Sequence, residues 1–277
     1  MRHARHAPKS PSGAALVARL RTVDAVVLDT DGVITDSARA HAAAWKEAFD
    51  AALRDHPPED PADRRPFDAE DDYRRYVDGK SRFDGAASFL ASRGFRLSQG
   101  DPDDAPGTRS VWAVAARKEQ LFSAFLREHA VAAWPGSVRL LRALHDAQLP
   151  RAAVSASRHA RDLLAGAGVL ELFQTVVDGN EATRLNLVGK PDPALFLEAA
   201  RRLDRPPHAT AVVEDALAGV EAGRAGGFGL VIGVDRTAGM TGAADLRRHG
   251  ADVVVADLAE LLASSEPSGG LSDVCGD

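Results

Sequence analysis

A short aliphatic run near the start of the chain breaks directly into two acids. Residues 25–28 are followed by Asp29 and Asp31, one residue apart, and then by Gly32. Such a run predicts a buried strand, and glycine permits a tight turn after it. Ligands of open α/β sheets bind at the carboxyl ends of the strands, where two acids can hold Mg²⁺, attack a substrate or move a proton. Asp-Gly after a strand is also an ordinary turn, so the rest of the chain has to decide.

The second half of the chain alternates between short apolar runs and helical stretches. The strands are predicted at 151–155, 175–177, 211–213, 230–234 and 252–255, and the helices near 136–147, 159–168, 193–203 and 216–226. Together with the strand at 24–28, this alternation predicts a Rossmann-like α/β fold with a parallel sheet and helices on both faces.

The stretch from residue 38 to residue 133 does not alternate in this way. It predicts helices at 38–54, about 70–77, 84–93 and 111–130, joined by loops rich in proline and aspartate. An all-helical insertion after the first strand predicts a cap domain over the strand ends. We therefore expect an N-terminal leader (1–20), a core domain (21–37 and 134–262), a helical cap (38–133) and a disordered tail (263–277).

Three further groups of polar residues follow predicted strands. They are Ser155-Ala156-Ser157-Arg158, Lys190 between a glycine and a proline, and the pair Glu214-Asp215. Each alone has an ordinary explanation, as a helix cap, a solvated loop lysine or an acidic helix start. Their succession predicts one site with a nucleophile, a proton carrier, a hydroxyl, a lysine and metal-binding acids, which suits Mg²⁺-assisted phosphoryl transfer.

With these motifs in order, residues 23–258 resemble the haloacid dehalogenase (HAD) superfamily, and within it the β-phosphoglucomutase-like group. The resemblance implies that Asp29 is the nucleophile and Asp31 the general acid/base. It implies that Ser155 and Lys190 hold the phosphoryl group, and that Mg²⁺ is bound by Asp29, the backbone carbonyl of Asp31 and Asp215, with Glu214 close to the metal or contributing a ligand. The other phosphate-binding or substrate-binding residues that it implies are Ser37, His41, Gly79, Lys80, Arg82, Ala156, Ser157 and Arg158.

Two activities on a sugar phosphate remain open. A mutase would convert β-glucose 1-phosphate to glucose 6-phosphate, with glucose 1,6-bisphosphate as activator and intermediate. A phosphatase would use the same Asp29 but let water attack. His41, Lys80 and Arg82 favour the mutase, whereas Asp78 and Lys80 depart from the group's pattern and leave the phosphatase open. Retention of all the motifs argues against a non-catalytic binding module.

The composition limits the kinds of partner that the chain could bind. The formal net charge is −6 and the pI is about 5.9, which argues against a nucleic-acid binder. Short apolar runs predict no membrane span, and the basic N-terminus lacks the apolar region of a secretory signal. With Cys275 as the single cysteine, the chain can form no internal disulfide. We expect a cytoplasmic monomer that acts on a small sugar phosphate.

Overall fold

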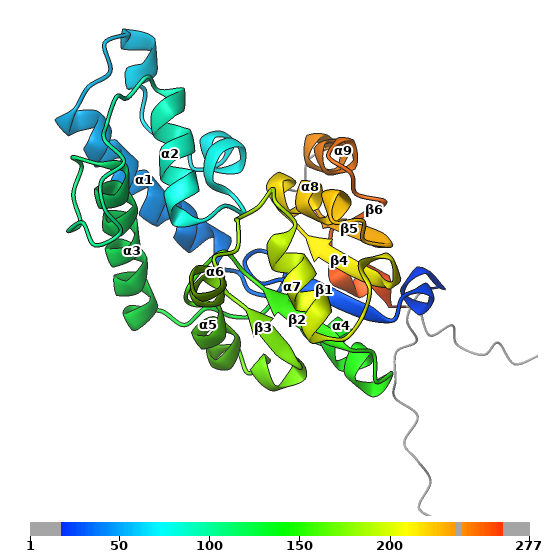
Figure 1. Cartoon of the computed structure of the whole chain (residues 1–277). Helices are drawn as coiled ribbons and strands as arrows, with labels where there is room; N and C mark the ends of the chain where they lie inside the picture. The colour runs from blue at the N-terminus through cyan, green and yellow to red at the C-terminus, as the bar shows by residue number, and fades with distance from the viewer. Residues whose placement is uncertain (1–17, 237–239, 263–277) are drawn as a thin grey trace, which may run out of the picture.

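A six-stranded parallel sheet forms the centre of the molecule (Figure 1). The computed structural model describes residues 18–236 and 240–262. The strand order is β3-β2-β1-β4-β5-β6, and every neighbouring pair is parallel. This confirms the predicted α/β fold. The predicted tail and most of the predicted leader lie outside the described residues.

The strands are β1 (Ala25–Asp29), β2 (Arg151–Val154), β3 (Thr175–Val177), β4 (Thr210–Glu214), β5 (Leu230–Val234) and β6 (Val253–Val255). The α-helices are α1 (Ala38–Asp55), α2 (Arg82–Ser92), α3 (Val111–Glu128), α4 (Pro135–Asp146), α5 (Ala160–Gly166), α6 (Gly179–Leu185), α7 (Ala194–Arg202), α8 (Leu217–Ala225) and α9 (Met240–Arg248). The short helices are η1 (Ala18–Thr22), η2 (Pro61–Arg64), η3 (Tyr73–Val77, a π-helix), η4 (Leu170–Leu172), η5 (Pro207–Ala209) and η6 (Leu258–Leu261).

Helices cover both faces of the sheet, so its central strands are buried throughout. All five residues of β1 and of β4 are buried. One hydrophobic core lies between the sheet and α4 and α5, and a second lies between the sheet and α7, α8 and α9. Burial on both faces explains why these strands are continuous aliphatic runs rather than alternating patterns.

The segment between β1 and β2 is helical and has a hydrophobic core of its own. Its helices α1, α2 and α3 gather beside one end of the sheet (Figure 1). Aromatic rings fill its centre, where Phe49 lies 4.7 Å from Trp45 and 4.1 Å from Phe89 between ring centroids. This core is separate from the two cores of the sheet. We call residues 38–133 the helical segment; its role as a cap and the predicted domain boundaries stay predictions.

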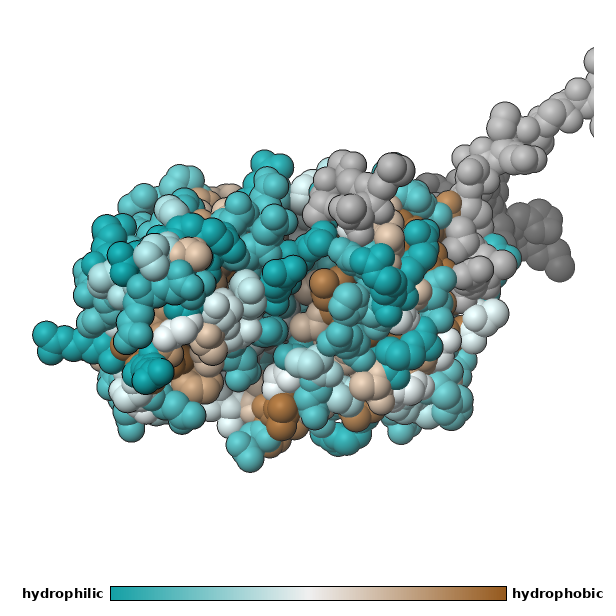
Figure 2. Space-filling view, turned by 90° about the horizontal axis from the view of Figure 1, so that it is seen from above, coloured by the Kyte–Doolittle hydropathy of each residue, from teal (hydrophilic) through white to brown (hydrophobic). Residues whose placement is uncertain are grey.

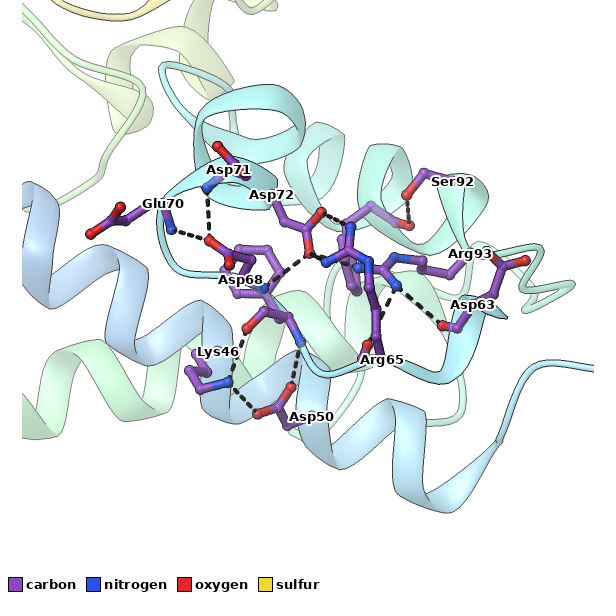
Figure 3. A network of polar contacts seen from close by, with 12 residues as sticks. Lys46, Asp50, Asp63, Arg65, Asp68, Glu70, Asp71, Asp72, Ser92 and Arg93 are labelled. Atoms are coloured by element: carbon purple, nitrogen blue, oxygen red, sulfur yellow. Dashed lines mark hydrogen bonds and ion pairs between the residues drawn. The ribbon is translucent and has the colours of Figure 1, made fainter. Parts of the chain in front are cut away.

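An ion triad around the buried Asp72 holds the long loop of the helical segment (Figure 3). The Asp72 carboxylate accepts from Arg65 (2.7 and 2.8 Å) and from Arg93 (2.6 Å), and also from the backbone N–H of Asp68 (3.0 Å). Asp72 is 2% exposed, so its charge relies on these donors. The triad thereby anchors the residue that directly precedes η3.

The two chain crossings between the helical segment and the sheet run side by side. Thr35 and Ala133 form an antiparallel bridge, flanked by hydrogen bonds from Trp134 N–H to the Ile34 carbonyl and from Asp36 N–H to the carbonyl of the residue before Ala133. The guanidinium of Arg236 lies 4.5 Å from the Trp134 ring centroid. We call this pair of crossings the hinge ladder.

Several element ends differ from expectation. The helix predicted at about 70–77 is present, but residues 73–77 form the π-helix η3, and the Asp68 carboxylate caps its start by accepting from the backbone N–H groups two and three residues on. The helix predicted from residue 84 begins at Arg82, since the Ser81 hydroxyl caps it. Helices α6 and α9 were not predicted.

Few large hydrophobic side chains of the described residues are exposed. Figure 2 shows a face on which hydrophilic residues predominate and hydrophobic ones occur in small groups. Among the described residues, Val188 is the one large hydrophobic side chain with high exposure. No helix in the described ranges combines the length and the apolar character needed to cross a bilayer.

Candidate active site

The predicted site residues meet at the carboxyl edge of the sheet. Asp29 is the last residue of β1, Glu214 is the last residue of β4, and Ser155 directly follows β2. The chain leaves β1 toward β2 and β3 on one side and returns to β4, β5 and β6 on the other. This reversal of strand order is where open α/β sheets bind ligands.

Lys190 links two of the acids. Its ammonium group contacts the carboxylate of Asp29 and lies 2.5 Å from Oε1 of Glu214, and its side chain is fully buried. The other oxygen of Glu214 accepts from the backbone N–H groups of Asp215 (2.6 Å) and Ala216 (2.8 Å). Glu214 is therefore held by three donors, and the lysine serves both acids at once.

Three carboxylates form one compact cluster. Oxygens of Asp29, Glu214 and Asp215 all lie within 4.8 Å of one another. Burial raises the pKa of Asp29 well above its usual value, with Lys190 opposing the shift and Glu214 adding to it. Burial and the negative charges of Asp78 and Glu214 likewise raise the pKa of Asp215. The cluster therefore holds more negative charge than Lys190 offsets.

This cluster fits a hard divalent cation. Its donors are all carboxylate oxygens, which Mg²⁺ and Ca²⁺ prefer. Gly32 packs directly against the Asp215 carboxylate, so that a Cβ at residue 32 would clash with it, and its φ is +79°. The glycine thus leaves space for the carboxylate beside the other two acids.

Asp31 lies in a different environment from Asp29. Its carboxylate accepts from the hydroxyls of Ser37 (2.5 Å) and Ser155 (2.8 Å), and its Oδ1 is 3.3 Å from Nε2 of His41. Burial would raise the pKa of Asp31, but His41 and the two hydroxyls lower it below its usual value. Because burial and a neighbouring lysine lower the pKa of His41 itself, we attribute the low Asp31 pKa chiefly to the hydroxyls.

That neighbouring lysine is Lys118 of α3, which the sequence analysis missed. Its ammonium donates to Nδ1 of His41 (2.9 Å), so a neutral His41 carries its proton on Nε2, which lies 3.3 Å from Oδ1 of Asp31 without a hydrogen bond. The Lys118 side chain lies over the Phe122 ring, and burial lowers its pKa to about 8. A signal was present, because Lys118 falls in the apolar stripe that Val114 and Phe122 define on α3.

The site opens into a cavity of about 550 Å³ between the helical segment and the sheet. Asp29, Asp31 and His41 line it, together with Gly79, Lys80, Arg82, Ala156, Ser157 and Arg158. The Lys80 ammonium, however, donates to the Ser88 hydroxyl on α2 (3.1 Å). Ser37 and Ser155 lie behind Asp31 and hold its carboxylate.

Two further cavity residues come from η3 and the turn after it. Tyr73 and Asp78 both line the cavity. Burial and the negative charge of Glu214 raise the pKa of Asp78 to about 7, while a hydrogen bond from Tyr73 opposes the shift. Next to them, Gly79 packs against Ala216 of the sheet half. The helical segment therefore closes directly over the acidic cluster.

A family model for haloacid dehalogenase-like hydrolases matches residues 23–227. A protein named beta-phosphoglucomutase from Mycobacterium bovis is 46% identical over 240 residues, which cover 87% of this chain and 92% of that protein. Another protein of that name from Bacillus subtilis is 30% identical and covers 83% and 92%. A crystal structure of a HAD family hydrolase from Deinococcus radiodurans, with bound phosphate and sodium, is 30% identical, has a TM-score of 0.58, and covers 87% and 93%.

The match therefore spans both the acidic cluster and the helical segment. These two curated relatives are matched over most of their length as well, so the likeness to them is not restricted to a shared motif. These relations show an enzyme, a phosphomutase or a phosphatase. This chain belongs to the haloacid dehalogenase-like hydrolase family.

Proposed function

We propose that this enzyme is a β-phosphoglucomutase, which converts β-glucose 1-phosphate to glucose 6-phosphate through glucose 1,6-bisphosphate. The observation that carries the proposal is the separation of the two acids. The Asp29 carboxylate contacts the Lys190 ammonium within the acidic cluster, whereas two hydroxyls hold the Asp31 carboxylate outside that cluster. One acid can thus attack phosphorus while the other exchanges protons with the sugar.

We propose that Mg²⁺ is held by Asp29, Glu214 and Asp215, with the backbone carbonyl of Asp31 as a further ligand. When bound, Mg²⁺ would neutralise charge on the transferring phosphoryl oxygens. Lys190 would keep the Asp29 carboxylate oriented and would share in binding the phosphoryl group. The hydroxyl of Ser155 would release Asp31 in order to contact the phosphoryl group as well.

The cycle begins from Asp29 carrying a phosphoryl group. The 6-hydroxyl of β-glucose 1-phosphate attacks the phosphorus, its proton passes to the Asp31 carboxylate, and the bond to Asp29 breaks to give glucose 1,6-bisphosphate. The bisphosphate turns round, and the Asp29 carboxylate attacks its 1-phosphate. The bond between phosphorus and O1 then breaks, O1 takes the proton from Asp31, and glucose 6-phosphate leaves.

The low pKa of Asp31 agrees with this order of events. Because Ser37 and Ser155 favour its carboxylate, Asp31 enters the cycle as a base and becomes an acid only after the first transfer. His41, directed by Lys118, contacts the same carboxylate from the helical segment. The helical segment therefore acts as a cap that completes the proton-transfer site when it closes.

Arg82 and Arg158 support a mutase rather than a phosphatase. Both line the cavity, and the positive charge of Arg158 is one of the causes, after burial, that lower the Arg82 pKa. Two guanidinium groups near each other suit the second phosphate of a bisphosphate. The 46% identical relative named beta-phosphoglucomutase supports the same choice.

A sugar-phosphate phosphatase is the second candidate. The Glu119 carboxylate lies 3.6 Å from Arg82 and offsets part of the positive charge that would bind a second phosphate. A phosphatase would use the same Asp29 intermediate and transfer the phosphoryl group to water instead of to the sugar.

A product assay separates the two candidates. The protein is incubated with β-glucose 1-phosphate, Mg²⁺ and a trace of glucose 1,6-bisphosphate, and glucose 6-phosphate and inorganic phosphate are both measured. We expect glucose 6-phosphate as the product. Release of inorganic phosphate without glucose 6-phosphate would establish the phosphatase. Asp29→Asn should abolish activity, whereas Asp36→Asn, at an exposed acid of the same loop, serves as the matched control.

A further inference from the structure

A carboxylate of the helical segment joins side chains from both halves of the molecule. Glu119 lies on α3, and its Oε2 is 3.6 Å from Nη1 of Arg82, the first residue of α2. Its Oε1 accepts from Nε2 of His159 (2.5 Å), which directly precedes α5 in the sheet half. One side chain therefore bridges the two walls of the cavity.

This bridge is sheltered and ionised. The side chains of Arg82, Glu119 and His159 are only 20%, 24% and 21% exposed. The hydrogen bond from His159 and the charge of Lys118 lower the pKa of Glu119 to about 2, although burial alone would raise that pKa. The negative charge is thus present throughout the neutral pH range, and the partners hold it in one place.

The groups that hold Glu119 are those that an incoming anion would use. Arg82 and Arg158 face the same part of the cavity, and His159 follows Arg158 in the chain. A phosphate bound there would need the same donors, so it must take them from Glu119. A phosphate offers three oxygens and more charge than a carboxylate, which makes the exchange feasible.

We propose that Glu119 is a specificity-determining residue, whose carboxylate occupies the position of a substrate's second phosphate and is displaced by it. The inference rests on the proposed function in one respect, namely that the substrate carries a second phosphate near Arg82. A bound bisphosphate takes over the bridge from Arg82 to His159 and keeps the two walls together. A substrate with an uncharged far end leaves Glu119 in place.

The selectivity for two phosphates over one tests this role. Glu119→Gln removes the competing charge and keeps the shape, and Glu128→Gln removes a charge from an exposed position of the same helix as a control. Both are made in the full chain with Asp29→Asn, so that ligand binding is measured without turnover. Calorimetry with Mg²⁺ compares glucose 1,6-bisphosphate with 4-nitrophenyl phosphate, which has a single phosphate.

We expect Glu119→Gln to tighten bisphosphate binding about tenfold, equivalent to about 1.4 kcal/mol, and to change aryl phosphate binding less than about twofold. Glu128→Gln should change neither. Glu119→Asp keeps the charge but withdraws it by one methylene, and should give a smaller gain. Unchanged or weaker bisphosphate binding in the two Glu119 variants, or equal changes for both ligands, would overturn the inference, since a merely structural bridge would weaken both.

Failure of this inference can be told from failure of the proposed function. Binding is measured without any product, whereas the function is judged by formation of glucose 6-phosphate in the wild type. If the wild type proves to be a phosphatase but Glu119→Gln still gains selectivity for the bisphosphate, the role of Glu119 stands and the mutase proposal fails. If the wild type is a mutase but the variant gains no selectivity, the mutase proposal stands and the role of Glu119 fails.

Discussion

Replacing Lys190 by methionine gives the sharpest test of the site's electrostatics. The lysine side chain is fully buried and contacts both Asp29 and Glu214. Methionine retains most of its length and apolar contacts but removes the charge. Glu214 keeps its two backbone donors, whereas Asp29 loses its cation within a cluster of acids.

The expected loss of stability follows from these contacts. Removing one partner of a buried ion pair costs about 3–5 kcal/mol. Protonation limits the loss, because protonating a carboxyl of ordinary pKa 3.8 at pH 7 costs about 4 kcal/mol at 1.36 kcal/mol per unit. We therefore expect Lys190→Met to lower the free energy of unfolding by about 4 kcal/mol at pH 7.

The pH dependence has a definite sign. In the variant, the pKa of the orphaned carboxyl is raised in the folded state, so near neutral pH the folded chain binds a proton that the unfolded chain does not. Lowering the pH toward the unfolded pKa then favours the folded variant by about 1.4 kcal/mol per unit. Because Lys190 opposes the rise of the Asp29 pKa in the wild type, the wild type gains less from this effect, and its advantage over the variant should shrink as the pH falls from 7 to 5.

Urea unfolding at both pH values, with a chelator present to exclude divalent cations, measures these differences. Lys46→Met is the matched control, because Lys46 is 45% exposed in its pair with Asp50 and should cost no more than about 1 kcal/mol. A loss at Lys190 as small as the control's, or one that does not change with pH, would refute the reasoning.

Three other substitutions test separate parts of the molecule. Arg82→Ala should lower kcat/KM for the sugar phosphate by about 10–100-fold and for a small aryl phosphate much less, whereas equal losses would show that Arg82 does not bind the distal phosphate. Asp72→Asn should destabilise the fold by about 3 kcal/mol in thermal or urea unfolding. Because Arg65 and Arg93 help to lower the pKa of Asp72 in the folded state, this difference should be full above about pH 4 and fade as the pH falls through that lowered pKa. Gly32→Ala should weaken Mg²⁺ binding at least about tenfold in calorimetry, since its Cβ would displace the Asp215 carboxylate, and unchanged affinity would contradict the proposed ligand set.

The sheet and the gathering of polar residues at its carboxyl edge could be predicted because their signals are local. Buried parallel strands are continuous aliphatic runs, and each polar group of the site lies next to a strand or a turn in the sequence. Asp29 and Glu214 could be placed at one edge without coordinates, since parallel strands end together.

The partners of these residues could not be predicted in the same way. That Asp31 accepts from Ser155 depends on how the turns after β1 and β2 lie against each other. That Lys118 donates to His41 depends on how α3 packs on α1, and that Glu119 meets His159 depends on how α3 lies against the sheet half. Such contacts join positions far apart in the chain and leave no periodic pattern. Helix α6 was missed because it is short, and its N-cap, Asp178, resembles any loop aspartate.

The hinge ladder has a consequence for how such a chain could be assembled. Where the chain leaves the sheet half and where it returns, Thr35 and Ala133 are paired as neighbours across an antiparallel bridge. The helical segment between these two residues therefore has the position of the loop in a β-hairpin. The entropy cost of closing a loop grows only with the logarithm of the loop length. A two-residue or three-residue turn could therefore join the same ends, and an unrelated folded insert could equally take that place. Under the proposed function, an exchange of the insert would change substrate choice while the acidic cluster at the edge of the sheet stayed the same.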